Sequence, residues 1–366
     1  MEHIKVRNIY YYPYELPLER PFVVKGVPLH KREGVIIQVV SDKGHVGFGE
    51  AAPLPGMSGE DLRKTVHQLD RMKDELCFLQ LPREREALLD FLSTRFAGDL
   101  VVPSVRFGIE SAFLSMVANV SNMSVAQFLG QKNPVTVSCA GLLQGGYQDV
   151  RSQMASLRSQ GYKIFELRAG SRNIPLDIQK VEGLKELMGP RETLRINADG
   201  QWSFQEAIIF AQSIGKNQVD FLEEPCGDVA LWEGIYRKTD MPLAMGESLA
   251  KIRVDDLEFS QAVSALVVRP MIHAGVSGFI RALRIATGMG KQVVVGGAFE
   301  SGVGQSMLAN LAVLTGQAAA LGSSTWLKTN LLEKPLISWG GVIFFEDLVF
   351  SPGMFLKDFR NGLEFV

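Results

Sequence analysis

The strongest constraint on this fold is a regular alternation of short apolar runs and amphipathic stretches, which begins near residue 134. The runs are apolar on both faces, as in buried parallel strands, and the stretches between them have helical periodicity. Successive polar residues at the ends of the runs lie about 22 to 31 positions apart, as one strand, one helix and two loops require. These polar residues are Arg168, Asn197, Asp199, Glu223, Glu247, Arg269 and Glu300.

This many strand–helix units predicts an α/β fold and favours a closed barrel over an open doubly wound sheet. An open dinucleotide-binding sheet would need a G-x-G-x-x-G turn after its first strand, and residues 140–149 lack it. The G-x-G fragments at 47–51 and 296–304 are weak signals that more often mark tight turns. In a barrel, the polar strand ends meet at one mouth.

The first hundred residues do not follow this alternation. Residues 5–16 and 34–51 read as strands, and residues 59–76 and 104–122 have helical spacing. An antiparallel sheet followed by helices predicts a separate α+β unit ahead of the barrel.

The composition is that of an ordinary soluble globular protein, with 366 residues, 46% hydrophobic, 21% charged and a net charge of −2. This charge balance argues against nucleic-acid and membrane-surface partners. No apolar run approaches the roughly 18 residues of a membrane helix, and the N-terminal segment has no signal-peptide core. Three cysteines without a C-x-x-C pattern fit a reducing cytoplasm. Among five scattered histidines, His273 follows a strand end and could line a pocket, although a surface-loop residue is the simpler reading.

Three carboxylates of the series come from consecutive strand ends and suit a magnesium ion. Asp199, Glu223 and Glu247 would supply oxygen ligands and leave room for water and a substrate. Each acid taken alone is as easily a loop or helix-capping residue. Arg168 and Arg269 lie on strands that flank the acids, where they could clamp a carboxylate or stabilise an enolate. The alternative is that both arginines form structural salt bridges to the same acids.

Several longer motifs make the chain resemble the o-succinylbenzoate synthases of menaquinone biosynthesis, in the muconate lactonizing enzyme subgroup of the enolase superfamily. The N-terminal stretch 18–60 is similar to that family, above all in Arg32-Glu33-Gly34 and in residues 49–56, GEAAPLPG. The segments FLEEPC, GES and GAFESGVGQSMLANLA continue the resemblance through the barrel. The similarity spans nearly the whole chain.

The resemblance implies a (β/α)7β modified TIM barrel under an N-terminal α+β capping domain. We expect the capping domain at 1–125, completed by the tail 331–366, and the barrel with the active site at 126–330. Within the tail, residues 337–356 read as extended strands that return to the N-terminal unit.

The resemblance also implies a chemistry. A lysine at the end of the second barrel strand removes a proton next to a carboxylate, Mg²⁺ stabilises the enediolate, and water is eliminated, with a second lysine on the sixth strand across the site. The metal would be held at Asn197, Asp199, Glu223 and Glu247. Loops of the capping domain would close over the substrate. The substrate-binding positions would be Lys25, Pro55, Gly56, Glu300, Ser301 and Gly302.

This chain departs from the family at the catalytic positions. Arg168 and Arg269 stand where the family has lysines, Asn197 and Asp199 are the family's pair in reverse order, and Gly246 replaces an aspartate. Lowering the pKa of a guanidinium from above ~12 to near 7 would cost roughly 7 kcal/mol, so Arg168 is a poor general base. Arg269 loses less, because a fixed cation needs only its charge.

Two classes of function follow. The first is an o-succinylbenzoate synthase-like lyase, a hydro-lyase that uses a divalent metal and a small-molecule carboxylate substrate in the cytoplasm. The second is a catalytically impaired relative that binds a carboxylate ligand. An N-acylamino acid racemase or dipeptide epimerase is a weaker possibility, because it needs two working bases. The oligomeric state is left open.

Overall fold

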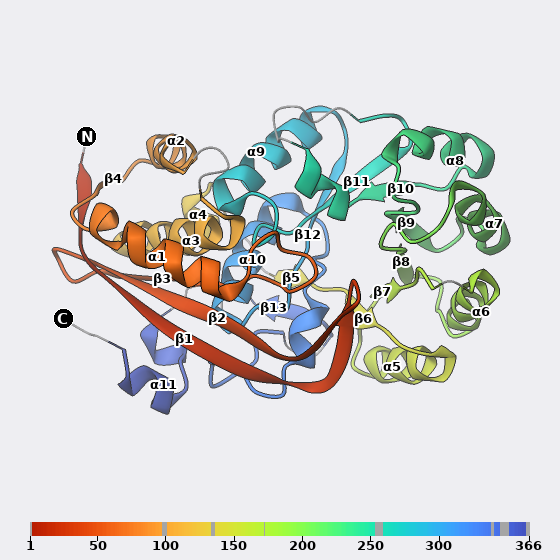
Figure 1. Cartoon of the computed structure of the whole chain (residues 1–366), viewed down its shortest axis with the longest axis horizontal. Coiled ribbons are helices and arrows are strands. Elements are labelled where there is room, and N and C mark those ends of the chain that lie inside the picture. Colours follow the sequence, from red (N-terminus) through yellow and green to blue (C-terminus); the bar gives the residue numbers. More distant parts are fainter. Residues whose placement is uncertain are drawn as a thin grey trace.

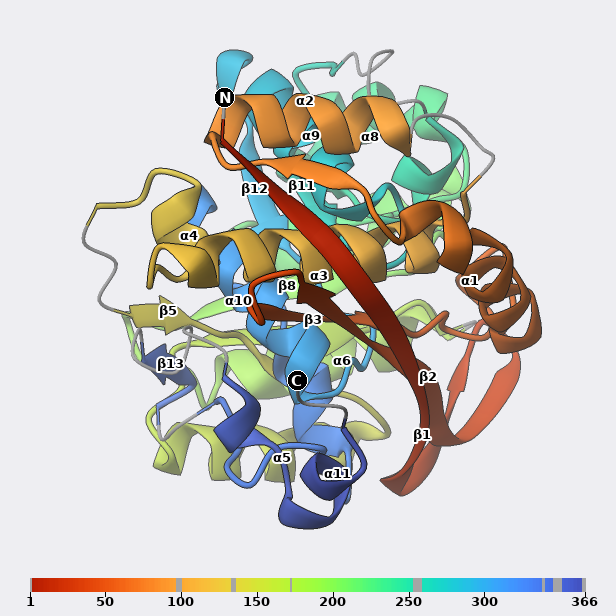
Figure 2. The same ribbon diagram turned by 90° about the vertical axis from the view of Figure 1, so that its left-hand side faces the viewer.

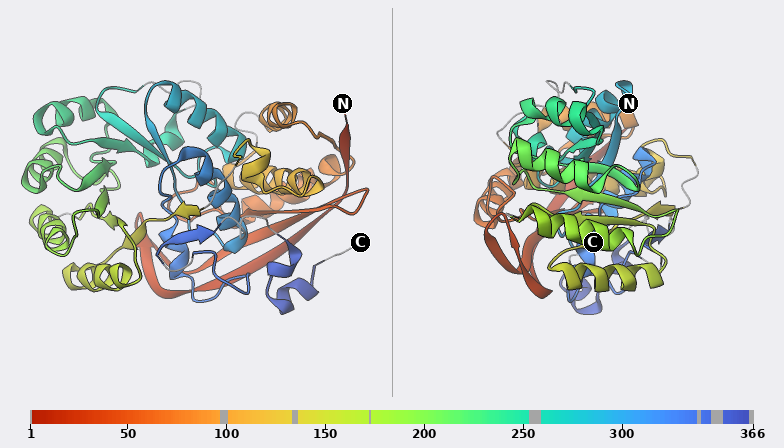
Figure 3. Two further views of the ribbon diagram at one scale, coloured as in Figure 1. Left: turned by 180° about the vertical axis from the view of Figure 1, so that it is seen from behind. Right: turned by 90° about the vertical axis from the view of Figure 1, so that its right-hand side faces the viewer.

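The computed structural model combines an N-terminal antiparallel sheet with a curled sheet of parallel strands surrounded by helices (Figures 1 and 3). The predicted α/β fold with a separate α+β unit is thereby confirmed. The structure describes residues 2–96, 101–132, 136–171, 173–252, 259–337, 340–344 and 351–363.

A long hairpin dominates the N-terminal sheet. Strand β1 (His3–Val24) pairs antiparallel with β2 (Val27–Ser41), and the hairpin extends toward barrel strands β6 and β7 (Figures 1 and 3). Its tip is a two-residue turn in which Lys25 and Gly26 have φ of 45° and 83°, the conformation that favours tight hairpins. The order of the sheet is β3-β2-β1-β4, with β3 at Val46–Ala51 and β4 at Gln80–Pro82.

Helix α3 (Pro103–Val120) packs on β3 with backbone close to backbone, behind β1 in the view of Figure 2. A Cβ on Gly47 would lie 2.1 Å from the carbonyl oxygen of Ala112, and one on Gly49 would lie 1.9 Å from that of Gly108. The expectation that this G-x-G fragment marks a tight turn is wrong, because its glycines let strand and helix approach. The other helices of this unit are α1 (Leu62–Leu76), α2 (Arg85–Arg95) and α4 (Val125–Phe128).

The barrel strands β6 to β12 are parallel and lie in chain order. The ring is completed by two alanines, since Ala320 N donates to Val295 O at 2.8 Å and Ala319 N donates to Ser138 O at 2.8 Å. The strands are β6 (Gly141–Leu143), β7 (Ile164–Arg168), β8 (Thr193–Asn197), β9 (Val219–Glu223), β10 (Leu243–Met245), β11 (Val263–Val268) and β12 (Gln292–Val295).

Helices cover the outside of these strands, and α5 to α8 form a row along one side (Figures 1 and 3). They are α5 (Tyr147–Ser159), α6 (Ile174–Lys185), α7 (Phe204–Ile214), α8 (Trp232–Thr239), α9 (Gly275–Gly288) and α10 (Gly302–Thr315). Short 3-10 helices lie at Val229–Leu231, Glu247–Lys251, Gly322–Trp326 and Pro352–Met354. No described helix is both long enough and apolar enough to cross a membrane.

The tail contacts both parts of the molecule. Strand β13 (Val342–Phe344) pairs antiparallel with β5 (Thr136–Ser138), and the ring of Phe355 packs edge-on against Phe48 of β3 with centroids 5.0 Å apart. Phe355 thus contacts the N-terminal sheet, but of the predicted extended stretch 337–356 only Val342–Phe344 forms a strand among the described residues, and Pro352–Met354 forms a 3-10 helix. Residues 338–339 and 345–350 of the tail lie outside the described residues. A last helix, α11, spans Lys357–Asn361.

The close approach of β3 and α3 leads to a stability prediction. Gly49→Ala should lower the free energy of unfolding by about 1–3 kcal/mol, because the new methyl group overlaps the carbonyl of Gly108 and helix and strand must separate. Gly59→Ala is the matched control, since a Cβ there meets nothing within 4 Å. Urea unfolding followed by circular dichroism measures both, and equal midpoints for the two variants would contradict the packing argument.

Candidate active site

Three of the predicted strand-end residues lie side by side in the parallel sheet. Arg168, Asn197 and Glu223 are the last residues of β7, β8 and β9, and the register pairs Arg168 with Asn197 and Asn197 with Glu223. Parallel register carries all three to the same barrel mouth. Glu247 lies two residues beyond the end of β10 and starts a short 3-10 helix.

The two arginines bind the acids of this mouth. Nη2 of Arg269 lies 3.0 Å from Oε1 of Glu223, and its Nη1 lies 3.5 Å from Oε1 of Glu247. Arg168 is more loosely held, with Nη1 3.6 Å from Glu247 Oε1 and Nη2 3.7 Å from Glu166 Oε1. Of the two readings drawn from the sequence, salt bridges to the acids describe this arrangement, although Arg168 keeps 26% of its side chain exposed.

Asn197 and Asp199 face different partners. Nδ2 of Asn197 donates to Glu247 Oε1 at 3.3 Å, while its Oδ1 accepts a hydrogen bond from the backbone N–H of Asp199 at 2.7 Å. The carboxylate of Asp199 lies 3.4 Å from Nζ of Lys25, at the tip of the β1–β2 hairpin. The structure thus brings Lys25, a predicted substrate-binding residue, from the N-terminal sheet to the barrel mouth.

In this arrangement the four predicted metal ligands do not fit a magnesium ion. Magnesium needs several oxygen atoms turned toward one point. Here the guanidinium of Arg269 lies between Glu223 and Glu247, Asn197 turns its N–H₂ toward Glu247, and Asp199 is paired with Lys25. Over the described ranges, no group of three or more His, Cys, Asp or Glu side chains is arranged to hold a metal.

Burial and neighbouring charges act in opposite directions on the acids of the mouth. Burial raises the pKa of Glu223, with the help of the Glu247 and Glu166 charges, while Arg269 at 3.0 Å favours its carboxylate form. Burial alone would also raise the pKa of Glu247, but Arg269 and Arg168 outweigh it and lower that pKa to about 2. Burial disfavours the charge of Arg269, yet Glu223 and Glu247 raise its pKa beyond the usual value. Arg269 is therefore a permanent cation and no proton acceptor.

His273 belongs to this mouth, and the expectation of a surface-loop histidine is wrong. Its Nδ1 accepts the backbone N–H of Arg269 at 3.1 Å, so the neutral ring carries its proton on Nε2. That Nε2 is shielded from solvent and has no hydrogen-bond partner. Burial and then the charge of Arg269 lower the pKa of His273 to about 3. Its position four residues after Arg269, which follows a strand end, was the sequence feature that could have placed His273 at the mouth.

The predicted residues Glu300, Ser301 and Gly302 lie at the junction between barrel and N-terminal sheet. Glu50 of β3 accepts hydrogen bonds from the N–H of Ser301 at 3.0 Å and of Gly304 at 2.8 Å, and from the Ser301 hydroxyl. The N–H of Gly302 is donated to Asn330 Oδ1 at 2.7 Å. These hydrogen bonds join the segment 301–304 to β3 through Glu50 and to the later part of the chain through Asn330.

Arg32 ties the two units further. Its buried guanidinium donates to the carbonyl oxygens of Ala52 at 2.7 Å, Pro53 at 2.8 Å and Phe299 at 3.2 Å. One residue of β2 thereby fixes both the loop after β3 and the loop after β12.

Pro55 and Gly56 are exposed and lie beside the hairpin. A Cβ on Gly56, where φ is +84°, would lie 2.4 Å from the carbonyl oxygen of Val24. With residues of β2 and α1 they line an open groove of about 1180 Å³ on the N-terminal unit. The loop 53–56 therefore lies against the hairpin near its tip, and Lys25 of that tip contacts the carboxylate of Asp199.

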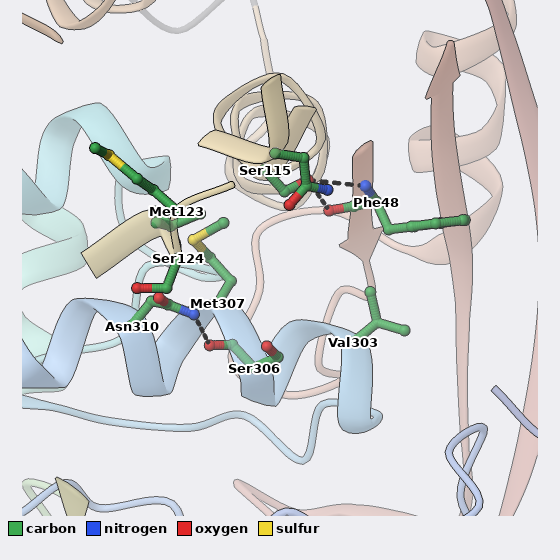
Figure 4. Close-up of a pocket in the computed structure, with 10 residues that line it drawn as sticks. Phe48, Ser115, Met123, Ser124, Val303, Ser306, Met307 and Asn310 are labelled. Carbon is green, nitrogen blue, oxygen red and sulfur yellow. Dashed lines mark hydrogen bonds between the residues drawn. The ribbon is translucent and has the colours of Figure 1, made fainter. Parts of the chain in front are cut away.

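A second, small cavity lies elsewhere in the fold (Figure 4). It encloses about 20 Å³ between α3, α4 and α10, and Ser115, Met307 and Asn310 are among its lining residues. That volume holds about one water molecule. It shares no residue with the barrel mouth.

The junction gives the stability a pH dependence. Burial raises the pKa of Glu300 to about 7, and the Glu50 charge adds to the shift. A carboxyl group with a raised folded-state pKa stabilises the fold below its unfolded pKa of about 4.3, and this contribution is lost as pH rises toward 7. We expect the free energy of unfolding of the unmutated chain to fall by at most about 3 kcal/mol between pH 4.5 and 7 because of this group, and Glu300→Gln to abolish that fall. Thermal melts across this range measure it; an unchanged pH profile in Glu300→Gln would contradict the assignment.

Comparisons with known proteins identify the family. The family model described as enolase C-terminal domain-like matches residues 149–363, and the model described as MenC, N-terminal domain, matches residues 6–116. The o-succinylbenzoate synthase of Haemophilus influenzae is 27% identical over 304 residues, which cover 82% of this chain and 84% of that protein. The N-succinyl-L-Arg/Lys racemase of Bacillus cereus is 24% identical over 308 residues, covering 83% and 82%.

Among solved structures, the muconate lactonizing enzyme from Pseudomonas fluorescens in complex with muconolactone has a TM-score of 0.85 at 20% identity, over 97% of each chain. The L-Ala-D/L-Glu epimerase from Bacillus subtilis has a TM-score of 0.82 at 20% identity, over 94% of this chain and 96% of that one. These similarities confirm the predicted barrel with an N-terminal capping domain. The chain belongs to the enolase superfamily.

Proposed function

We propose that this chain is a catalytically impaired relative of the o-succinylbenzoate synthases, whose barrel mouth binds a small carboxylate. The observation that carries the proposal is a group of shielded polar atoms without hydrogen-bond partners at the mouth: Nη1 of Arg269, Nε2 of His273 and Oε2 of Glu247. Buried polar atoms are almost always partnered in folded proteins. Three such atoms on two adjacent strand ends support a site that a ligand completes.

The donors of the mouth suit an anion. Arg269 is a permanent cation, His273 presents an N–H, and the guanidinium of Arg168 is a quarter exposed. Charge-assisted hydrogen bonds from such groups favour a carboxylate ligand. Oε2 of Glu247 adds one acceptor for a hydroxyl group or a water molecule. The cyclohexadiene carboxylate substrate of the synthase, which loses water in the reaction, has both a carboxylate and a hydroxyl group, whereas o-succinylbenzoate offers the carboxylates.

The hairpin tip covers this site. Lys25 and Asp199 are 33% and 24% exposed and join the capping unit to the barrel across 3.4 Å. The charge of Lys25 acts on Glu247 and His273, so the hairpin tip lies close to the shielded atoms. We propose that the hairpin opens to admit the ligand and that Lys25 then contributes to its binding.

Proton abstraction is poorly supported by these residues. A general base must be uncharged before it accepts a proton. Arg168 has a guanidinium group, which is almost always charged in proteins, and it lies 3.7 Å from Glu166 and 3.6 Å from Glu247. A racemase or dipeptide epimerase would need a second base, and Arg269 is held by two acids.

The synthase activity itself is the second candidate. It is favoured by the match of residues 6–116 to the MenC N-terminal domain and by the relatives named o-succinylbenzoate synthase. Enolase superfamily members generally use Mg²⁺, and here the metal would have to displace Arg269 from Glu223 and Glu247. With either candidate we propose a cytoplasmic protein with a small-molecule ligand, a capping domain at 1–125 completed by 331–366, and a barrel at 126–330.

Turnover separates the two candidates. Purified protein with millimolar Mg²⁺ and the cyclohexadiene carboxylate substrate of the synthase should show no absorbance change above the uncatalysed rate. Arg168→Lys tests the base argument, because lysine at this position can lose its proton. Mg²⁺-dependent turnover by the unmutated chain, at or above the rate of Arg168→Lys, would establish the lyase and end the proposal of an impaired enzyme.

Binding tests the proposal directly. Titration calorimetry with o-succinylbenzoate should show binding that Arg168→Met weakens by about tenfold or more, the effect of losing a hydrogen bond from a charged donor. Arg237→Met is the control, because Arg237 is 76% exposed on α8 and pairs only locally with Glu233. Equal affinity in Arg168→Met and Arg237→Met, or no binding at all, would refute ligand binding at this mouth.

A further inference from the structure

We propose that Arg269 is a built-in replacement for the divalent cation of this barrel mouth. Its guanidinium is almost fully buried and contacts carboxylates from two neighbouring strand ends, Glu223 at 3.0 Å and Glu247 at 3.5 Å. Buried carboxylates need a cation in contact, because water no longer solvates them. A fixed side chain supplies it here. The inference concerns the ion content of the mouth and holds whichever ligand binds.

Gly246 makes the pairing of Glu223 possible. A Cβ at this position would lie 2.0 Å from Oε1 of Glu223, which is closer than real atoms approach. Any side chain at 246 would therefore push the Glu223 carboxylate out of its contact with Arg269. The glycine that replaces an acid in this motif does more than remove a ligand, because it makes room for the acid that Arg269 binds.

Gly296 makes room for the arginine itself. A Cβ there would lie 2.9 Å from Cγ of Arg269 and 3.4 Å from its Nε. Gly296 follows β12, the neighbour of β11, so Arg269 runs across the backbone of the next strand. Two glycines from different strands thus accommodate one guanidinium and the carboxylate it binds.

The charges also match. Glu247 contacts Arg269 at 3.5 Å and Arg168 at 3.6 Å, so two single positive charges surround it. Together they equal the charge of one divalent ion. A metal entering between Glu223 and Glu247 would meet a fixed like charge, which opposes its binding strongly at low dielectric. We infer that the mouth excludes divalent ions while Arg269 is present.

Removing this one charge should convert the mouth into a cation site. In Arg269→Met, Glu223 and Glu247 lose the cation between them and are left as buried carboxylates of the kind that bind Mn²⁺ or Mg²⁺. Arg269→Lys keeps a cation there and should remain closed to metal. Arg195→Met is the matched control. Arg195 is also a buried arginine of the barrel, but it pairs with Asp220 at 2.8 Å and not with Glu223 or Glu247.

The experiment is Mn²⁺ titration followed by electron paramagnetic resonance, with circular dichroism melts to verify that each variant is folded. Arg269→Met should bind one Mn²⁺ at least about tenfold more tightly than the unmutated chain, Arg269→Lys and Arg195→Met. Adding Glu223→Gln to Arg269→Met should abolish the gain, which separates this site from surface acids. If Arg269→Met does not fold, Arg269→Gln serves the same comparison.

Two results overturn the proposal. One is an unmutated chain that binds Mn²⁺ as tightly as Arg269→Met and loses it in Glu223→Gln. The other is a folded Arg269→Met, or Arg269→Gln, with no gain over the unmutated chain. Neither result depends on carboxylate binding, so failure here and failure of the proposed function are told apart.

Discussion

The arrangement of this barrel mouth depends on one buried guanidinium. Arg269 is nearly inaccessible to solvent and holds Glu223 and Glu247 from two strands. Leaving either acid buried without a cation would be strongly destabilising, so the three groups are mutually dependent. The backbone N–H of Arg269 also sets the proton of His273 on Nε2. Arg269 thus orients both acids with its side chain and fixes the tautomer of His273 with its backbone.

The N-terminal unit has two kinds of contact with the barrel. Glu50 and Arg32 form a buried junction in which carboxylate and guanidinium bind backbone groups of the 299–304 segment. Such contacts are lost only when the units separate. The contact of Lys25 with Asp199 is partly exposed, and a pair of this kind contributes little to stability. We therefore propose that the hairpin tip moves while the junction stays closed.

Much of the fold follows from periodicity in the sequence. Strand–helix spacing places Arg168, Asn197 and Glu223 at strand ends, and the parallel register then makes them neighbours. Periodicity does not predict where two backbones come close together. The glycines of β3 therefore suggested a turn, and the groups packed against Gly246 and Gly296 could not be predicted. It also does not indicate contacts such as Lys25 with Asp199, which join segments far apart in the chain.

The type of a residue predicts its charge more reliably than it predicts which groups its side chain contacts. The two arginines are identifiable as permanent cations from the sequence alone, but whether they face a substrate or the acids is decided by packing. Asp199 lies two residues beyond Asn197, yet its positive φ of 54° turns it away from the strand and toward the hairpin. His273 looked like a loop residue because only the fold withdraws its Nε2 from solvent.

We infer that a side chain, and no metal ion, balances the acids of this mouth. The most direct measurement is anomalous diffraction at the manganese edge from crystals of the unmutated chain grown with millimolar Mn²⁺. We expect no anomalous peak between Glu223 and Glu247, and the guanidinium of Arg269 in contact with both. A peak within about 2.5 Å of these carboxylates, with Arg269 displaced from them, would contradict the claim.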